Sequence, residues 1–148
     1  MEIILHRKNK LSDLLNSNPK YGIEVDIRSN NGKLIINHDP MSKINNDFEK
    51  WLSEYKHKTL IVNIKEEGLE NEILKKLNKY QIKDFFFLDQ SFPFLIIKNN
   101  IVRKNTALRF SEFESIETIL NTCDYAKWIW IDCFNKYPKI EKSKLNYL

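Results

Sequence analysis

Two acidic residues, Glu24 and Asp26, stand at alternating positions within an apolar run near the N-terminus. Side chains two positions apart in a strand point to the same face, so one cation could reach both carboxylates. The intervening Ile23, Val25 and Ile27 predict that the other face is packed. Buried carboxylates need a partner, and Mg²⁺ or Ca²⁺ suits such oxygen ligands. A salt-bridged pair on a half-exposed strand would show the same alternation.

Two histidines, His6 and His38, each have a charged neighbour and follow a predicted strand or hairpin. Imidazoles exchange protons near neutral pH, so one could act as general base and the other as general acid in phosphodiester cleavage. A structural role is the alternative for each of them. The third histidine, His57, lies in a polar connection, where we expect a structural role.

Two cationic residues complete the candidate set. Arg7 offers a planar fork of donors for phosphate oxygens, although it could equally pair with strand carboxylates. Lys65 follows Asn63 by two residues at the end of an apolar run. A lysine there needs an anionic partner, such as Glu24 or Asp26. Use of Lys65 as a Schiff-base nucleophile in an aldolase-type enzyme is a further alternative.

The elements that must position these residues follow from hydrophobic periodicity. Strands are expected at residues 3–5, 23–27, 59–64, 85–88, 106–108 and 128–131, and Asn31-Gly32 predicts a turn that folds residues 33–37 back. Helices are expected at residues 11–16, 46–55, 69–80 and 115–121 and after Pro93, with Asn46 or Asp47 as a cap.

This alternation, with polar residues at the carboxyl ends of strands, is typical of repeated βα units. We therefore expect an α/β fold of the TIM (β/α)8 barrel type, shortened to about six βα units with the C-terminal units missing or divergent. The chain has 148 residues, whereas a full barrel typically has about 250. A fragment of a barrel and an open α/β sheet are the alternatives.

Composition bounds the organisation and the partners. The 148 residues predict one domain over the whole chain. The net charge of +4 is dispersed along the chain, so we expect no nucleic-acid partner. The sequence indicates no apolar run long enough to span a membrane, no secretory leader and no disulfide framework. We therefore expect a cytoplasmic location. No pattern fixes an oligomeric state.

Four segments together resemble the glycerophosphodiester phosphodiesterase family: Leu-His-Arg (5–7), Gly-Ile-Glu-Val-Asp-Ile (22–27), Asn-Gly-Lys-Leu-Ile-Ile-Asn-His-Asp (31–39) and Val-Asn-Ile-Lys (62–65). A looser likeness continues at residues 85–93 and 130–132. The resemblance implies a metal-assisted phosphodiesterase whose small-molecule substrate is a glycerophosphodiester or a related phosphodiester, such as a phospholipid head group or a phosphodiester-linked glycan. It also implies a role for each candidate residue: His6 and His38 as the acid–base pair, Arg7 and Lys65 as phosphate contacts, and Glu24, Asp26 and Asn63 as ligands of Mg or Ca.

The chain departs from the family pattern at three places. Asn63 stands where the family usually has an acidic residue, which predicts weaker metal binding. Lys8 replaces a usual glycine and adds positive charge near the phosphate site. Only residues 40–45 occupy a connection where the family often has a cap, which predicts an open site. These departures motivate an alternative, a catalytically weak or inactive relative that binds a phosphorylated ligand.

Overall fold

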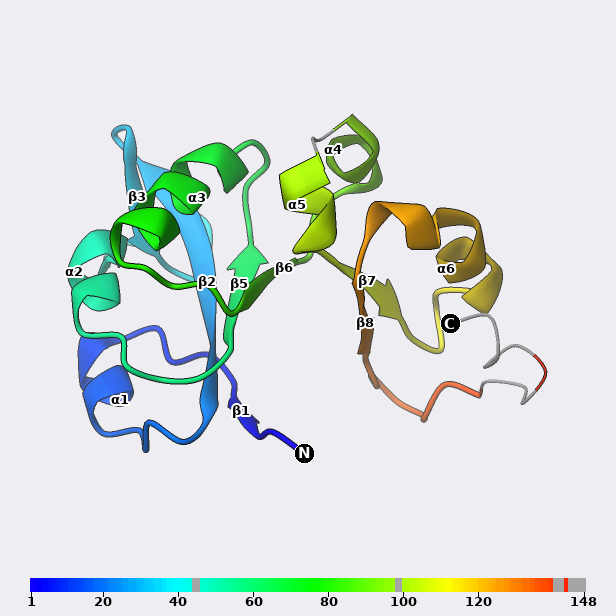
Figure 1. The fold of residues 1–148 in the computed structure, drawn as a ribbon, viewed down its shortest axis with the longest axis horizontal. Helices are drawn as coiled ribbons and strands as arrows, with labels where there is room; N and C mark the ends of the chain where they lie inside the picture. Colours follow the sequence, from blue (N-terminus) through cyan, green and yellow to red (C-terminus); the bar gives the residue numbers. More distant parts are fainter. Residues whose placement is uncertain (44–45, 98–99, 140–142, 144–148) are drawn as a thin grey trace. The chain divides into compact units, whose positions relative to one another are not determined.

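The computed structural model describes residues 1–43, 46–97, 100–139 and 143, with the backbone alone at 97 and 100. The chain forms two compact units, Met1–Gln90 and Ser91–Leu148 (Figure 1). Compact units of this size occur both as halves of one domain and as separate domains. The prediction of one domain over residues 1–148 therefore stays a prediction, and each unit is described by itself.

The first unit contains a six-stranded mixed sheet. Its strands are β1 (Ile4–Leu5), β2 (Gly22–Asn30), β3 (Lys33–Ile36), β4 (Asn46–Asp47), β5 (Leu60–Ile64) and β6 (Phe85–Leu88). The order is β4-β3-β2-β5-β6, with β1 also paired to β2. Strand β2 pairs in parallel with β1 and β5, and β5 pairs in parallel with β6. Strand β3 pairs antiparallel with both β2 and β4.

The predicted TIM (β/α)8-type barrel is wrong. No barrel closes within the described residues, since the sheet is open and mixed. Asn31 and Gly32 both have positive φ, 49° and 73°, and turn β3 back as the antiparallel partner of β2. A barrel needs a continuous ring of parallel strands. Here the last two strands instead form a sheet of their own.

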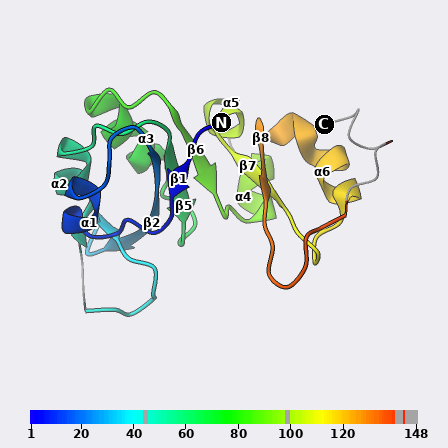
Figure 2. The ribbon, with the colours of Figure 1, turned by 90° about the horizontal axis from the view of Figure 1, so that it is seen from below.

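Three helices lie on one side of this sheet (Figure 2): α1 (Leu11–Leu15), α2 (Phe48–Ser53) and α3 (Glu70–Lys79). Each helix buries apolar side chains, among them Leu14, Trp51, Ile73 and Leu77. The predicted cap of α2 is confirmed, since the Asp47 carboxylate accepts a hydrogen bond from the Lys50 backbone N–H at 2.9 Å. Hydrophobic burial of these helices against apolar strand residues holds the unit together.

The two faces of β2 differ in chemistry. One face carries Ile23, Val25 and Ile27, which lie beside Leu60, Val62 and Ile64 of β5, and all six are buried. The other face carries Glu24 and Asp26, with Asp26 beside Asn63. The predicted separation of apolar and acidic faces is confirmed.

One edge of β2 is interrupted beside these acids. Strand β5 runs along the other edge from residue 23 to 27, while β1 pairs with residues 22–23 and β3 with residues 27–30. Between β1 and β3, Lys8 N donates to Glu24 O at 3.0 Å, and Asp26 N donates to Asn9 Oδ1 at 3.1 Å. The segment of residues 6–9 therefore fills a gap in the β ladder.

The second unit contains α4 (Phe92–Ile97), α5 (Asn100–Lys104), β7 (Ala107–Phe110), α6 (Ile116–Thr122), a 3₁₀ turn (Cys123–Tyr125) and β8 (Trp128–Ile131). Strands β7 and β8 are parallel and α6 connects them, as expected of a βα unit. Its core comprises Leu95, Leu108, Phe110, Ile116 and Ile119. Among the described residues, no helix is long and apolar enough to cross a membrane.

Candidate functional site

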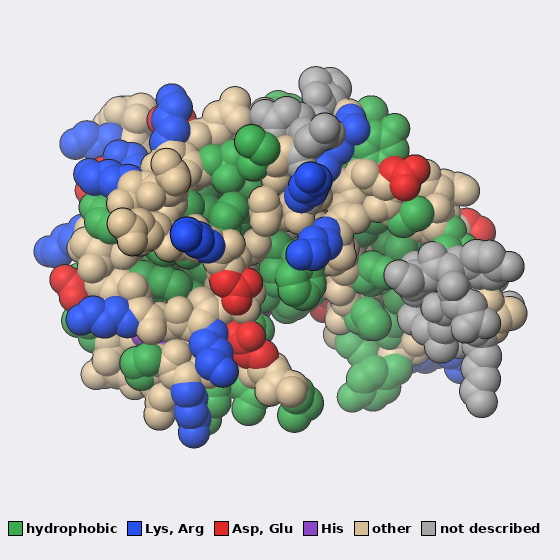
Figure 3. Space-filling model, viewed as in Figure 1, with side chains coloured by type: hydrophobic (Ala, Val, Ile, Leu, Met, Phe, Trp, Pro, Cys, Tyr) green, Lys and Arg blue, Asp and Glu red, His purple; other side chains and the backbone are tan. Residues whose placement is uncertain are grey.

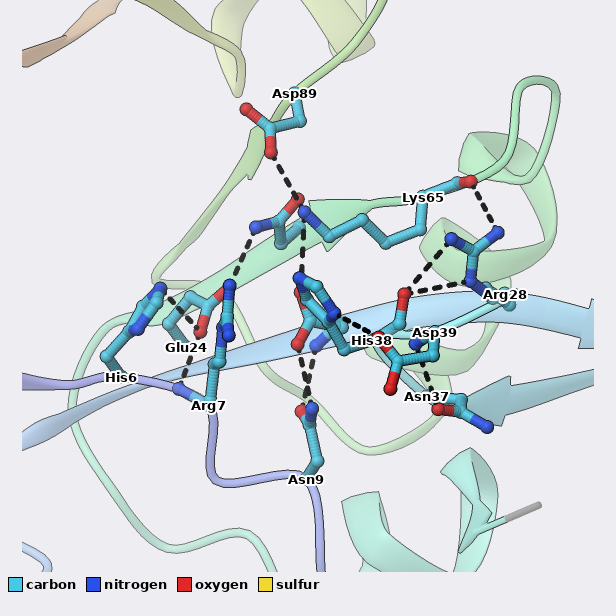
Figure 4. Close-up of polar contacts among 12 residues, drawn as sticks. His6, Arg7, Asn9, Glu24, Arg28, Asn37, His38, Asp39, Lys65 and Asp89 are labelled. Atoms are coloured by element: carbon cyan, nitrogen blue, oxygen red, sulfur yellow. Dashed lines mark hydrogen bonds and ion pairs between the residues drawn. The ribbon is translucent and has the colours of Figure 1, made fainter. Parts of the chain in front are cut away.

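The acidic pair lies at the centre of a polar cluster in the first unit (Figure 4). Glu24 and Asp26 are both 0% exposed. Glu24 Oε1 accepts a hydrogen bond from Asn63 Nδ2 at 2.9 Å, and its Oε2 accepts one from the Arg7 backbone N–H at 2.6 Å. Asp26 Oδ2 accepts a hydrogen bond from Asn9 Nδ2 at 2.7 Å. The carboxylates are thus fixed by groups from β5 and from residues 7–9.

The two predicted acid–base residues come to this cluster from different segments (Figure 4). His6 Nε2 lies 3.4 Å from Glu24 Oε2, and its side chain is 56% exposed. His38 follows β3, and its Nδ1 lies 2.8 Å from Asp39 Oδ1. Each imidazole therefore contacts a carboxylate and is also accessible to solvent.

The electrostatics of Asp39 link the two segments. The hydrogen bond with His38 lowers the pKa of Asp39 from its ordinary value, and the charges of Arg7 and Arg28 act in the same direction. Arg7 has a φ of 53°, an uncommon conformation for a residue other than glycine, and it directs its N–H to Glu24. The N-terminal segment and the segment after β3 thus share one electrostatic environment.

Lys65, directly after β5, bridges two acids. Its Nζ lies 3.0 Å from Asp89 Oδ2 and 3.5 Å from Asp26 Oδ1, and its side chain is 17% exposed. The prediction that this lysine requires an anionic partner is confirmed. Asp89 follows β6 and has a φ of 64°. Charges from the middle of β2 and from the ends of β5 and β6 therefore meet.

The sequence reasoning missed four members of this cluster: Asn9, Arg28, Asp39 and Asp89. Asn9 both donates to Asp26 and accepts from its backbone. Arg28 lies two residues after Asp26, so strand alternation could have placed it on the same face. Asp89 follows the apolar run that forms β6, so its position at a strand end could have indicated it. Asn9 carried no such signal.

His57 lies outside this cluster. Its Nε2 lies 3.2 Å from the backbone oxygen of Ser17, and its ring contacts Tyr55 at 5.5 Å between ring centres. This environment is typical of a structural histidine.

The expected short connection before α2 includes residues 44 and 45, which lie outside the described residues, so the prediction of an open site is not tested there.

Two buried side-chain oxygen atoms of the cluster lack a hydrogen-bond donor. Asp26 Oδ1 and Asn63 Oδ1 are buried, and neither accepts a hydrogen bond from any described residue. Asp26 and Asn63 are register partners across β2 and β5. The described residues contain no metal-type group of three or more His, Cys, Asp or Glu side chains. The two unbonded atoms are one carboxylate oxygen and one amide oxygen, both of a kind that Mg²⁺ and Ca²⁺ take as ligands.

The face of the molecule in Figure 3 has mixed charge. On the face shown in Figure 3, Lys and Arg side chains are dispersed among acidic, polar and apolar atoms. A protein that binds nucleic acid typically gathers such residues into a patch or stripe. The expectation of no nucleic-acid partner stays a prediction.

No protein-family model, no curated protein and no solved structure matches the chain. The likeness to glycerophosphodiester phosphodiesterases therefore depends on the sequence segments themselves. One of those segments, residues 22–27, contains the buried carboxylates, and two others, residues 5–7 and 62–65, supply side chains or backbone groups that contact them.

Proposed function

We propose that this chain is a metal-assisted phosphodiesterase that hydrolyses a glycerophosphodiester or a related small-molecule phosphodiester. The observation that carries the proposal is the fully buried pair Glu24 and Asp26, with accessible imidazoles in the same polar cluster. Buried carboxylates are costly unless cations or hydrogen bonds offset their desolvation. In the proposed reaction this pair would hold a cation next to the acid–base groups.

Binding of the substrate phosphate would depend on Arg7 and Lys65. The Arg7 guanidinium offers donors in the fork geometry that matches two phosphate oxygens. The Lys65 ammonium lies beside Asp26 and adds positive charge. Glu24, Asp26 and the Asn63 amide oxygen would hold the cation, which when bound neutralises charge on a non-bridging phosphoryl oxygen.

The two histidines would divide the proton transfers. One imidazole accepts the proton of the attacking water or substrate hydroxyl as the new P–O bond forms, and the other protonates the departing alkoxide as the old P–O bond breaks. With Nδ1 held by Asp39, Nε2 of His38 is the nitrogen that exchanges a proton with the substrate. Attack by water yields a phosphomonoester and an alcohol, whereas attack by a substrate hydroxyl yields a cyclic phosphate.

A second candidate function is binding of a phosphorylated ligand without efficient turnover. The amide of Asn63 and the N–H of Arg7 already satisfy Glu24, while Asn9 and Lys65 contact Asp26. These internal contacts stabilise the acids in the absence of a metal. Asn63 also leaves the cation with one carboxylate fewer than the family pattern implies.

Turnover of a chromogenic aryl phosphodiester and of a glycerophosphodiester, with Mg²⁺ or Ca²⁺ and with chelator, tests the first candidate. We expect metal-dependent activity that falls about 10²- to 10⁴-fold in His6→Ala and in His38→Ala, because each variant lacks one proton-transfer group. His57→Ala is the control and keeps the activity. Absent or metal-independent turnover by the pure protein contradicts the proposal. Calorimetric binding of glycerol phosphate without turnover would support the second candidate.

A further inference from the structure

Arg28 has no role in the proposed chemistry, yet it contacts two of the segments that carry it (Figure 4). Its Nε and Nη2 donate to the backbone oxygen of His38 at 3.2 and 3.0 Å. Its Nη1 donates to the backbone oxygen of Lys65 at 2.9 Å. One guanidinium therefore joins the backbones of a predicted acid–base residue and a predicted phosphate contact.

These two segments come from opposite sides of β2. His38 follows β3, and Lys65 follows β5, and both strands pair with β2 at Ile27. After Ile36, Asn37 N donates to Asp26 O at 3.0 Å, and after Ile64, Lys65 N donates to Ile27 O at 3.0 Å. Among the described residues, no further backbone hydrogen bond joins His38 or the residues after Lys65 to β2. Arg28 is the next residue of β2, and its side chain spans this region.

The geometry of the contact requires an arginine. A guanidinium presents donors at fixed angles in a plane, so it can hold two carbonyl groups at a set spacing, whereas a lysine ammonium is a single point on a flexible stem. Three of the donor contacts of Arg28 go to carbonyl oxygens. This use distinguishes it from Arg7, whose side chain is proposed to bind the phosphate.

We infer that Arg28 is a positioning residue, which fixes His38 and Lys65 relative to the buried acids Glu24 and Asp26. The catalytic part of this inference rests on the proposed phosphodiesterase function. The structural part of the inference does not rest on that function, because it concerns only how firmly the backbone is held at His38 and Lys65. Arg28 acts through His38 and Lys65 and makes no contact with the reacting atoms.

The test compares Arg28→Lys and Arg28→Gln with the wild-type protein, and Lys33→Met in the same hairpin is the control. Backbone amide exchange is measured at Asn37, Asp39 and Lys65, which all donate hydrogen bonds in this region. We expect exchange at these amides to become about tenfold faster in both Arg28 variants, since the loss of a hydrogen bond to a charged group costs about this factor or more. Exchange in α3 should stay unchanged.

Steady-state kinetics of the same proteins supply the second readout. We expect kcat to fall about 10- to 100-fold in both Arg28 variants with KM within about twofold, as for other groups that orient a site without contacting substrate. Arg28→Lys keeps the charge, so its loss of rate would reflect the lost fork. Lys33→Met should match the wild type in both measurements.

The outcomes separate the two hypotheses. If the wild-type protein has no phosphodiesterase activity and the Arg28 variants still show faster local exchange, the positioning role of Arg28 is supported and the proposed function is contradicted. Unchanged exchange at Asn37, Asp39 and Lys65 would overturn the inference whether or not the protein is active. Faster exchange throughout α3 as well would also overturn it, because Arg28 would then be a general stabilising residue. If the wild-type protein is active, an unchanged kcat in the Arg28 variants would also overturn the inference.

Discussion

At the scale of single residues, Asn63 most directly limits how strongly the candidate site could hold a cation. Its amide donates to Glu24 while its buried oxygen accepts no hydrogen bond from the described residues. The side chain thus combines a donor that stabilises the acid with an oxygen available to a metal. An aspartate would provide the second function and lose the first.

We expect Asn63→Asp to be less stable than the wild type in chelator and to gain more from divalent cations. Without metal, the new carboxylate lies against Glu24, and like charges at this separation repel. With Ca²⁺ or Mg²⁺, a third carboxylate should tighten binding about tenfold, because ligand charge sets affinity for these ions. Thermal unfolding across a cation titration measures both effects.

Asn71→Asp is the matched control, since Asn71 is exposed on α3. Its Tm should respond to cations as the wild type does. Equal Tm shifts in Asn63→Asp and Asn71→Asp would count against a cation site beside Asn63.

At the scale of elements, Gly22 permits the close approach of β1, β2 and β5. A Cβ at this position would lie 2.2 Å from Ile4 Cδ1 and 2.7 Å from the Thr59 backbone oxygen. That oxygen already accepts a hydrogen bond from Ile23 N at 2.9 Å, so it cannot move without loss of this bond. Gly32, in contrast, has no atom within 4 Å of such a Cβ, and only its φ of +73° opposes a side chain.

We expect Gly22→Ala to lower the free energy of unfolding by about 1–3 kcal/mol through overpacking. Gly32→Ala should lower it by about 1 kcal/mol through backbone conformation alone. Denaturant titration of both variants measures the difference. A larger loss in Gly32→Ala would refute the steric explanation of Gly22.

A charged cluster connects α2 with α3. Glu49 accepts hydrogen bonds from Lys76 and Lys79, each at 2.5 Å. These bonds lower the pKa of Glu49 to about 2. The ordinary pKa of a glutamate is 4.5, so folding favours the charged form of Glu49. The two hydrogen bonds therefore stabilise the folded protein fully above pH 4.5, and this stabilisation is lost as the pH falls from 4.5 toward 2.

We therefore expect Glu49→Gln to be less stable than the wild type at neutral pH, with the difference vanishing between pH 4.5 and 2. Unfolding curves recorded across this pH range measure the difference. Glu54→Gln, at the exposed end of α2, is the control and should track the wild type. A difference that persists undiminished at pH 2 would show that Glu49 acts through packing.

At the scale of the whole molecule, local patterns predicted most of the elements but not the architecture. They missed α5, and they placed Asn46 and Asp47 in a helix, whereas these residues form β4. Asn31-Gly32 fixed the hairpin because its turn conformation is encoded in adjacent residues. The alternation of Glu24 and Asp26 likewise predicted their shared face. Whether the sheet closes depends on pairing between distant strands, and no short-range pattern records which edges meet.

The candidate site shows the same division. His6, His38, Glu24, Asp26 and Lys65 each stand at a position that strand periodicity or a strand end marks in the sequence. Arg28 and Asn9 act through contacts across the fold with His38, Lys65 and Asp26. Such contacts depend on tertiary arrangement: the spacing of Arg28 from Asp26 indicates a shared face but not its partners, and nothing in the sequence marks Asn9.

The gap in the edge of β2 has a consequence for redesign. Residues 6–9 fill that gap with hydrogen bonds to Glu24 and Asp26, while β1, β3 and β5 pair with β2 around it. Arg7 and Lys8 bond Glu24 through their backbone N–H groups, whereas Asn9 bonds Asp26 through its side chain. Libraries that randomise His6, Arg7 and Lys8 while retaining Asn9 would therefore vary the side chains beside the buried acids while the surrounding strands stay the same.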